Sequence, residues 1–478
     1  MTKLHDTQSA AIAKNNYTVS ADLGTISRLG LFNLGLGLMS VLTLAVLNRI
    51  MIDELAIPAT VTAGVLAMSQ LIAPARVWFG QLSDLRPLFG LHRTSYVLLG
   101  TVLFSVAVFV ALQVVWRLGD LIQLQEGWRI NSETLSFVVL LGILFGLYGM
   151  ALSLGSTPFT ALLVDISSED NRSKVVAIAW SILMLGIVLG GIFGSVLFKS
   201  LDGDFSFELL KSTINRVFIV VPMIVFGLAL VGTWGVERKY SRFQSRSRVQ
   251  DREEGMTFKR AWRILTTSRQ TGLFFGFLML MTFSLFMQEA VLEPYAGEVF
   301  GMSIAESTQL NAFWGVGILI GYSTTGFLII PRIGKQATVK VGCVLVSLCF
   351  VVIILAGLTT TPDVLRGALI LFGIATGLTV IGAISLMLDL TISTAAGTFI
   401  GAWGLAQALA RAFATFGGGA ILDLGKFFFT NTWLAYSLVF ACQSVGMLLS
   451  ILVLNQVSVA VFRQENEEST LMAMEDAL

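Results

Sequence analysis

The chain has 478 residues, 55% of them hydrophobic and only 13% charged, which is about half the charged fraction of an average soluble domain. Apolar stretches of roughly twenty residues recur from residue 28 to residue 459, and each is long enough to cross a bilayer as a helix. This composition excludes a soluble globular protein. The length of the stretches excludes a β-barrel, whose strands alternate and are about half as long.

Only helices satisfy the backbone inside apolar runs of this length, so we predict an all-α polytopic membrane protein with about 12 transmembrane helices. The expected spans are residues 28–50, 60–82, 95–116, 136–164, 173–198, 216–236, 270–292, 306–330, 337–358, 366–388, 397–421 and 432–458.

Basic residues gather in alternate connections, and the largest group lies in the segment 237–269 between the sixth and seventh spans. Cytoplasmic loops carry an excess of Lys and Arg, so both termini and this segment are expected in the cytoplasm. The predicted organisation is an N-terminal cytoplasmic tail (1–27), two six-helix halves (28–236 and 270–458), a basic linker (237–269) and an acidic tail (459–478). We interpret the linker as a topology determinant that also contacts anionic lipid, and we expect no nucleic-acid partner.

The two halves resemble repeats of one another. Gly30-Leu31-Phe32 opens the first span and Gly272-Leu273-Phe274 opens the seventh. Asp165 ends the fourth span and Asp389 ends the tenth. The preserved order of such matches predicts two units related along the membrane normal.

The strongest local motif lies between the second and third spans and contains Gly80, Asp84, Arg86, Gly90 and Arg93. It resembles the loop motif of the major facilitator superfamily, and this resemblance implies the major facilitator fold. Gly80 permits close helix packing. Asp84 can accept charge-assisted hydrogen bonds from Arg86 or Arg93, or cap a helix N-terminus. We predict a conformational latch here; the alternative is a tight turn with solvated charges.

The turn after the fourth span is a second charged site at the predicted cytoplasmic face. Asp165 and Arg172 flank this turn, and Asp389 occupies the corresponding place in the second half. These residues either form a cytoplasmic gate or are ordinary solvated interfacial charges.

Few charged residues lie within or beside the predicted spans. Arg49 lies at the outer end of the first span, Glu289 and Glu293 lie at the outer end of the seventh, and Arg76 lies near the inner end of the second. Arg411 lies well inside the eleventh span. An unpaired arginine there would cost several kcal/mol, so Arg411 is expected to face a carboxylate from another helix or a ligand.

The central stretches of the first, fourth, seventh and tenth spans contain no Asp, Glu, His, Lys or Arg. These spans line the cavity of major facilitators, so the cavity is expected to be apolar and to suit a hydrophobic ligand or none. The sequence contains no enzyme motif and no Cys/His cluster with metal-ligand spacing, so we predict neither an enzyme nor a metal site.

Three segments carry a more specific resemblance: LNRIMIDEL-AIPA (47–59), LIAPAR (71–76) and QEAVLEPYAG (288–297), which continues through residue 315. They are similar to the PucC/LhaA-type bacteriochlorophyll delivery family, and the chain looks closer to the branch found in cyanobacteria. The resemblance implies delivery or handling of chlorophyll or bacteriochlorophyll as cargo during assembly of light-harvesting or photosystem complexes. It also implies a thylakoid or intracytoplasmic membrane, with antenna or photosystem subunits and pigment-synthesis enzymes as partners.

The magnesium ion of such a pigment takes oxygen or imidazole ligands, and the sequence has no histidine within its apolar core. The candidate ligand-binding residues are Asn48, Arg49, Gln288, Glu289, Glu293, Gln407 and Arg411.

Two other functions stay open at this point. One is a secondary transporter of a small hydrophobic or amphiphilic solute. The other is an assembly scaffold that binds no pigment, for which the acidic tail could serve as a docking segment.

Overall fold

The computed structural model describes residues 22–72, 74–167, 172–201, 206–240, 269–390, 396–458 and 460–461. Within these ranges, 11 helices are long and apolar enough to cross a membrane. The remaining span consists of the shorter apolar helix α4 (Ala59–Leu71) and its continuation α5 (Ala75–Leu85). The predicted all-α architecture of about twelve spans is therefore confirmed.

The first six spans form one half of the molecule. The first span is composite, because two π-helical segments with wide turns, η1 (Val41–Val46) and η2 (Ile50–Glu54), flank the short helix α3. The helices of this half are α2 (Leu23–Ser40), α3 (Leu47–Arg49), α4, α5, α6 (Thr94–Leu124), α7 (Ser132–Ile166), α8 (Arg172–Leu197), α9 (Phe207–Thr233) and α10 (Val236–Tyr240), with a 3₁₀ turn at Lys199–Leu201.

The second half contains the remaining spans and a short helix between the first two of them. Its elements are α13 (Arg269–Phe286), the 3₁₀ turn η4 (Met287–Ala290), α14 (Leu292–Phe300), α15 (Ile304–Thr324), the π-helical η5 (Thr325–Ile329), α16 (Ile330–Ile333), α17 (Lys335–Thr359), α18 (Pro362–Asp389), α19 (Ala396–Phe428) and α20 (Thr432–Leu454).

Four of the expected spans differ clearly from the structure. The sixth begins at Phe207 instead of residue 216, because Ser206 caps the start of α9. The eleventh ends at Phe428 instead of residue 421, because Leu422 still packs into the core.

Residues 60–82 were expected to form one helix, but α4 ends at Leu71 and α5 begins at Ala75, after Pro74. Proline lacks the backbone N–H that a helix interior needs, so it stands at the start of α5. The third span was expected to end at residue 116, but α6 continues to Leu124 because Leu118 and Ile122 still pack into the core.

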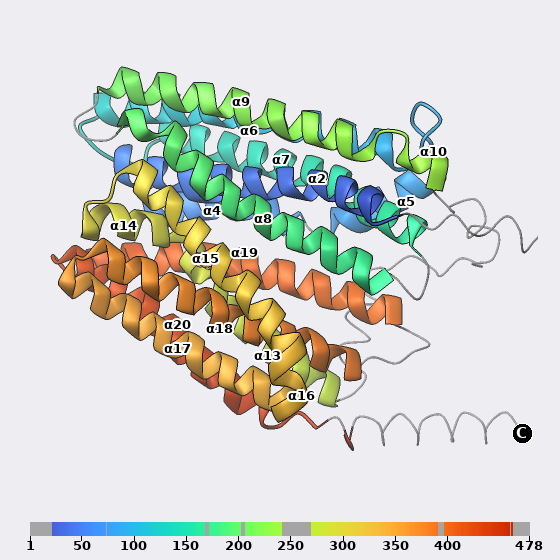
Figure 1. Cartoon of the computed structure of the whole chain (residues 1–478). Helices are drawn as coiled ribbons and strands as arrows, with labels where there is room; N and C mark the ends of the chain where they lie inside the picture. Colours follow the sequence, from blue (N-terminus) through green and yellow to red (C-terminus); the bar gives the residue numbers. More distant parts are fainter. Residues whose placement is uncertain are drawn as a thin grey trace, which may run out of the picture.

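The helices of each half pack mainly against one another, and two helix pairs join the halves: α8 with α15, and α4 with α19. Figure 1 shows the first half (blue to green) lying against the second half (yellow to red), with their helices running in a similar direction. Each half has its own apolar core. The core of the first half contains Trp116, and the core of the second half contains Tyr295. Large apolar side chains such as Met223, Leu348 and Leu452 are exposed, as expected for a surface in contact with lipid.

Small residues allow the helices of each half to approach closely. A Cβ atom at Gly100 of α6 would lie 2.5 Å from the backbone nitrogen of Gly155 in α7. At Gly227 in α9, an added Cβ would meet nothing within 4 Å. Glycine at position 100 is therefore required by packing, whereas glycine at position 227 is not.

The substitution Gly100→Ala should destabilise the protein by about 1–3 kcal/mol, because the added methyl group forces α6 away from α7. Thermal unfolding in detergent measures this as a lower Tm. Gly227→Ala is the matched control and should leave the Tm unchanged or raise it, since alanine favours helix. Equal effects of the two substitutions would contradict the packing argument.

Candidate functional site

The two ends of the helices form two opposite faces of the molecule. We call the face at which α2 begins and α20 ends the termini face, and the opposite one the far face. The motif after the second span lies at the termini face, and Arg49 lies at the far face. The candidate residues fall into three groups: one at each face and one between the halves.

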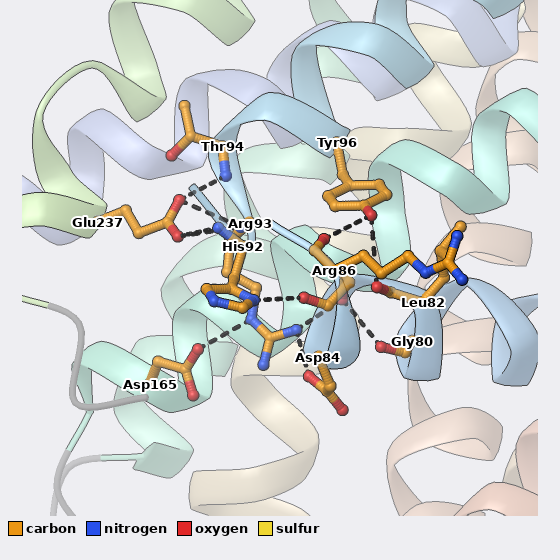
Figure 2. A network of polar contacts seen from close by, with 11 residues as sticks. Gly80, Leu82, Asp84, Arg86, His92, Arg93, Thr94, Tyr96, Asp165 and Glu237 are labelled. Atoms are coloured by element: carbon orange, nitrogen blue, oxygen red, sulfur yellow. Dashed lines mark hydrogen bonds and ion pairs between the residues drawn. The ribbon is translucent and has the colours of Figure 1, made fainter. Parts of the chain in front are cut away.

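Arg93 is the centre of the group at the termini face (Figure 2). Its guanidinium lies 2.5 Å from a carboxylate oxygen of Asp84 and 3.0 Å from one of Asp165, and it donates a hydrogen bond of 2.6 Å to the hydroxyl of Ser83. Arg93 and Asp165 are buried, whereas Asp84 is half exposed. A buried guanidinium shared by two carboxylates holds the end of α7 against the loop that precedes α6.

Glu237 in α10 completes this group from the other side. Its carboxylate accepts hydrogen bonds from the backbone N–H groups of His92 at 2.6 Å, Arg93 at 3.1 Å and Thr94 at 2.7 Å. These N–H groups belong to the start of α6, where the helix dipole favours a negative charge. Glu237 therefore caps α6, a role for which Asp84 had been a candidate.

The other predicted latch residues make different contacts. Arg86 was one of two possible partners of Asp84, but its side chain is exposed and points away from Asp84 in Figure 2, and its carbonyl accepts from Tyr96 at 2.7 Å. Gly80 accepts at its carbonyl from Ser83 at 2.9 Å. Gly90 has φ +75°, a conformation that glycine adopts without strain.

The predicted gate is only partly within the described residues. Asp165 pairs with Arg93 in the same half. The side chains of Arg172 and Asp389 lie outside the described residues. The gate therefore stays a prediction.

At the far face, Arg49 of the first half reaches into the second half. It is only 5% exposed, and it donates hydrogen bonds to the carbonyls of Ser303 at 2.6 Å and Met302 at 2.5 Å and to the hydroxyl of Ser307. Asp53, one turn along the same span, lies 3.4 Å away. Arg49 therefore bonds the end of the first span to the start of α15.

Two further contacts join the halves at this face. Asn48 donates to the carbonyl of Ala290 at 3.0 Å. The carboxylate of Asp423 in α19 accepts from the backbone N–H groups of Ala59 at 3.0 Å and Thr60 at 2.7 Å, so it caps α4 of the other half. Among the described residues, the hydrogen bonds that join the two halves all lie at this far face. The structure is therefore closed on the far face.

The third group surrounds Arg411, near the middle of α19. Its guanidinium forms a bidentate pair with Glu289, whose Oε2 lies 2.9 Å from Nε, and it stacks over the ring of Phe286 with its carbon 4.6 Å from the centroid. The Arg411 side chain remains 36% exposed. Gln407 lies one helical turn away on the same face of α19 and is partly exposed.

Two more candidate ligands are buried in the second half. Gln288 is 4% exposed, and Glu293 is also 4% exposed with its carboxylate accepting from the side chain of Asn311 at 3.0 Å. Of the seven candidate ligand residues, Glu289, Gln407 and Arg411 are partly exposed, whereas Asn48 and Arg49 are buried where they join the halves at the far face. In the described part of the chain, no three His, Cys, Asp or Glu residues are grouped so as to hold a metal ion.

The sequence reasoning missed Glu237, Asp423 and the hydroxyl of Ser307. Glu237 stands directly after the sixth span, at the start of a segment in which basic residues outnumber acidic ones, and its sequence position does not indicate a capping role. Asp423 lies just beyond the predicted end of the eleventh span. Their partners are more than 100 residues away, so only the folded chain shows the pairing.

The chain that carries these three groups of residues matches a known protein family. The model of the family described as PUCC protein matches residues 46–462, which is most of the chain and includes all three groups of candidate residues. The chain belongs to the PUCC protein family. Among curated relatives, Protein PucC of Rhodobacter capsulatus is 26% identical over 90% of this chain and 91% of its own. The "Bacteriochlorophyll synthase 44.5 kDa chain" of the same species is 29% identical over 88% and 92%.

Solved structures show the same fold at low sequence identity. The nucleoside transporter NupG has a TM-score of 0.64 at 14% identity, with 91% of this chain and 100% of that one covered. The inward-open xylose transporter XylE of E. coli has a TM-score of 0.59 at 15% identity, with 90% and 94% covered. This member of the family therefore has the major facilitator fold, as predicted.

Replacing Arg93 by alanine should destabilise the protein by about 3–5 kcal/mol, because the buried Asp165 would lose its ion pair with the Arg93 guanidinium. Thermal unfolding in detergent measures the loss as a lower Tm. The matched control is Arg86→Ala, which removes an exposed charge of the same motif and should change the Tm little. If Arg86→Ala were as damaging as Arg93→Ala, Arg93 would not be the partner that stabilises this face.

Substituting Arg49 by glutamine should loosen the far face, because the hydrogen bonds to Ser303 and Met302 are lost. Spin labels at positions 126 and 360, one on each half at this face, should then populate longer distances in double electron–electron resonance, after the native cysteines have been replaced. Arg366→Gln is the matched control, since the ion pairs of Arg366 within the described ranges are with Glu306 and Asp363 of its own half. Unchanged distances in Arg49→Gln would show that other contacts close this face.

Proposed function

We propose that this protein handles chlorophyll or bacteriochlorophyll as cargo and delivers it during assembly of light-harvesting or photosystem complexes. The membership of the PUCC protein family over residues 46–462 carries this proposal. One relative is the "Bacteriochlorophyll synthase 44.5 kDa chain" of Rhodobacter capsulatus, which aligns along nearly its whole length. We propose handling rather than catalysis, because the shared fold is that of transporters.

The surroundings of Arg411 suit a large, flat and mainly apolar cargo. Aromatic side chains lie along this region: Phe286 under the guanidinium, and Trp403 one turn before Gln407 on the same face of α19. The N–H group of the Trp403 indole has no acceptor among the described residues. Aromatic walls stack against a macrocycle, and a few polar groups fix its orientation.

Gln407 is the residue of this chain that would hold the pigment through its magnesium ion. Its amide oxygen is a hard donor, partly exposed, and no hydrogen bond to this side chain is found among the described residues. A single neutral oxygen would bind magnesium weakly, which suits a protein that must release its cargo. Asn48 and Gln288 are engaged or buried in this conformation and are less suited to the role.

The proposal includes an orientation and a location. The termini face would be cytoplasmic, because the connection of residues 241–268 on that side is rich in Arg and Lys. The halves 28–236 and 270–458 would move relative to one another. The membrane would be a photosynthetic one, and the partners would be antenna or photosystem subunits and pigment-synthesis enzymes. Membership of the cyanobacterial branch stays a prediction.

The test is to purify the tagged protein in mild detergent from a host that makes chlorophyll or bacteriochlorophyll and to record its absorption spectrum. The wild-type protein should carry pigment at a near-stoichiometric level, and Gln407→Ala should lower that level several-fold because the magnesium loses its ligand. Gln456→Ala, at the exposed end of α20, is the matched control and should retain pigment.

A colourless wild-type protein would contradict the proposal. If it were to bring antenna or photosystem subunits with it, the protein would be a scaffold that binds no pigment. If it were colourless and solitary, a transporter of a small amphiphilic solute would become the leading function, and uptake into proteoliposomes would test it.

A further inference from the structure

Asp53 is a buried carboxylate that lies between the two halves at the far face. It belongs to the π-helical η2 at the end of the first span, and its side chain is 9% exposed. On its other side lies α14 of the second half, where a Cβ atom added to Gly297 would overlap a carboxylate oxygen of Asp53. The carboxylate therefore rests against the backbone of α14. π-Helical turns are rare and are frequently found at functional sites.

The Asp53 carboxylate is poorly satisfied as an anion. Within the described ranges, neither of its oxygens has a hydrogen-bond donor. Its ion pair with Nε of Arg49 spans 3.4 Å, whereas a charge-assisted hydrogen bond is about 2.7–2.9 Å long. The other two guanidinium nitrogens of Arg49 donate to acceptors at the start of α15. A buried carboxylate with so little compensation is costly when ionised and much less costly as a neutral acid.

The surroundings of Asp53 contain more acids than bases. Glu298 directly follows Gly297 and pairs with Lys426 at 2.7 Å, and Lys426 lies over the ring of Tyr436. The charged and titratable groups that face Asp53 are Arg49 and Glu54 on its own span, Glu298 on α14, Lys426 on α19 and Tyr436 on α20. The helix α4, which also packs against η2, has no charged residue.

Counting these charges shows what the cluster lacks. The two cations, Arg49 and Lys426, meet three carboxylates, and Glu293 and Glu306 also face the Arg49 guanidinium from the second half. One proton balances the two cations and three carboxylates. In the described part of the chain, no three acidic, His or Cys side chains are grouped to hold a metal ion, whereas a proton needs only one carboxylate oxygen.

We propose that Asp53 is a proton-binding site, and that the far face closes with a proton on this carboxylate and opens as the proton leaves. In the closed state the carboxyl group is neutral. On opening, its O–H bond breaks, water accepts the proton, and a solvated carboxylate remains, because an aspartate in water is ionised at neutral pH. This inference goes beyond the proposed function, since it concerns the movement of the two halves and holds for any cargo.

The sign of the pH dependence follows from the proton count. The closed state holds one proton more than the open state, so a rise in pH favours the open state by up to about tenfold per pH unit. Asparagine at position 53 is neutral at every pH and close in shape to the protonated acid. It should therefore hold the far face closed and remove the dependence on pH.

The experiment measures the distance between spin labels at positions 126 and 360 by double electron–electron resonance, in the full chain in nanodiscs with the native cysteines replaced. Raising the pH from about 6 to about 9 should move the population toward the longer distance. Asp53→Asn should keep the shorter distance throughout. Asp363→Asn removes an exposed carboxylate of the second half and is the matched control, which should respond to pH as the wild type does.

Infrared spectroscopy detects the proton itself and needs no variant. At the lower pH the protein should show the carbonyl stretch of a protonated carboxylic acid, and ¹³C labelling of the aspartate side chains should shift this band. The band should disappear over the pH range in which the distance lengthens. A band that responds only to labelling of glutamate would place the proton on another acid and overturn the assignment.

Two results of the distance measurement would also overturn the proposal. One is a wild-type distance that does not change with pH. The other is a pH response that survives in Asp53→Asn; if Glu293→Gln abolished that response, Glu293 would hold the proton instead. No pigment enters these measurements, so their failure would leave the proposed function standing, and a colourless protein would leave this inference standing.

Discussion

The hydrogen bonds of Arg49 to the backbone at the start of α15 determine which face of the molecule is closed. A buried guanidinium is costly unless nearly all its donors find acceptors, and here the carbonyl acceptors belong to the opposite half. If the halves separated on the far face, water would solvate the Arg49 guanidinium, and its charge would no longer carry the desolvation cost of burial. Closure on this side therefore depends on Arg49 together with Asn48 and Asp423, which also join the halves at the far face.

The charged group at the termini face is organised differently. The ion pairs of Arg93 with Asp84 and Asp165, and the hydrogen bonds that Glu237 accepts, lie within the first half. This arrangement holds the helix ends of the first half together at that face. The contrast between the faces is what a rocking movement of two rigid halves requires.

Hydropathy was sufficient to predict the helices, because each span must be apolar over its whole length. The motif after the second span also located Asp84 and Arg93 in advance. The partners of Arg49 and the cap made by Asp423 could not be predicted, because backbone groups such as the carbonyl of Met302 leave no signature in sequence. Arg411 was expected to face a carboxylate from another helix, but only the folded chain shows that this carboxylate is Glu289.

The cap that Glu237 places on α6 has a consequence for signals from outside the membrane. Glu237 stands three residues before the last described residue of the first half, Tyr240, and the connection of residues 241–268 follows at once. A force applied to that connection by a partner or a charged surface would pull directly on one carboxylate. Because this carboxylate holds the start of α6, beside the guanidinium of Arg93, the connection is mechanically coupled to the two acids that Arg93 binds.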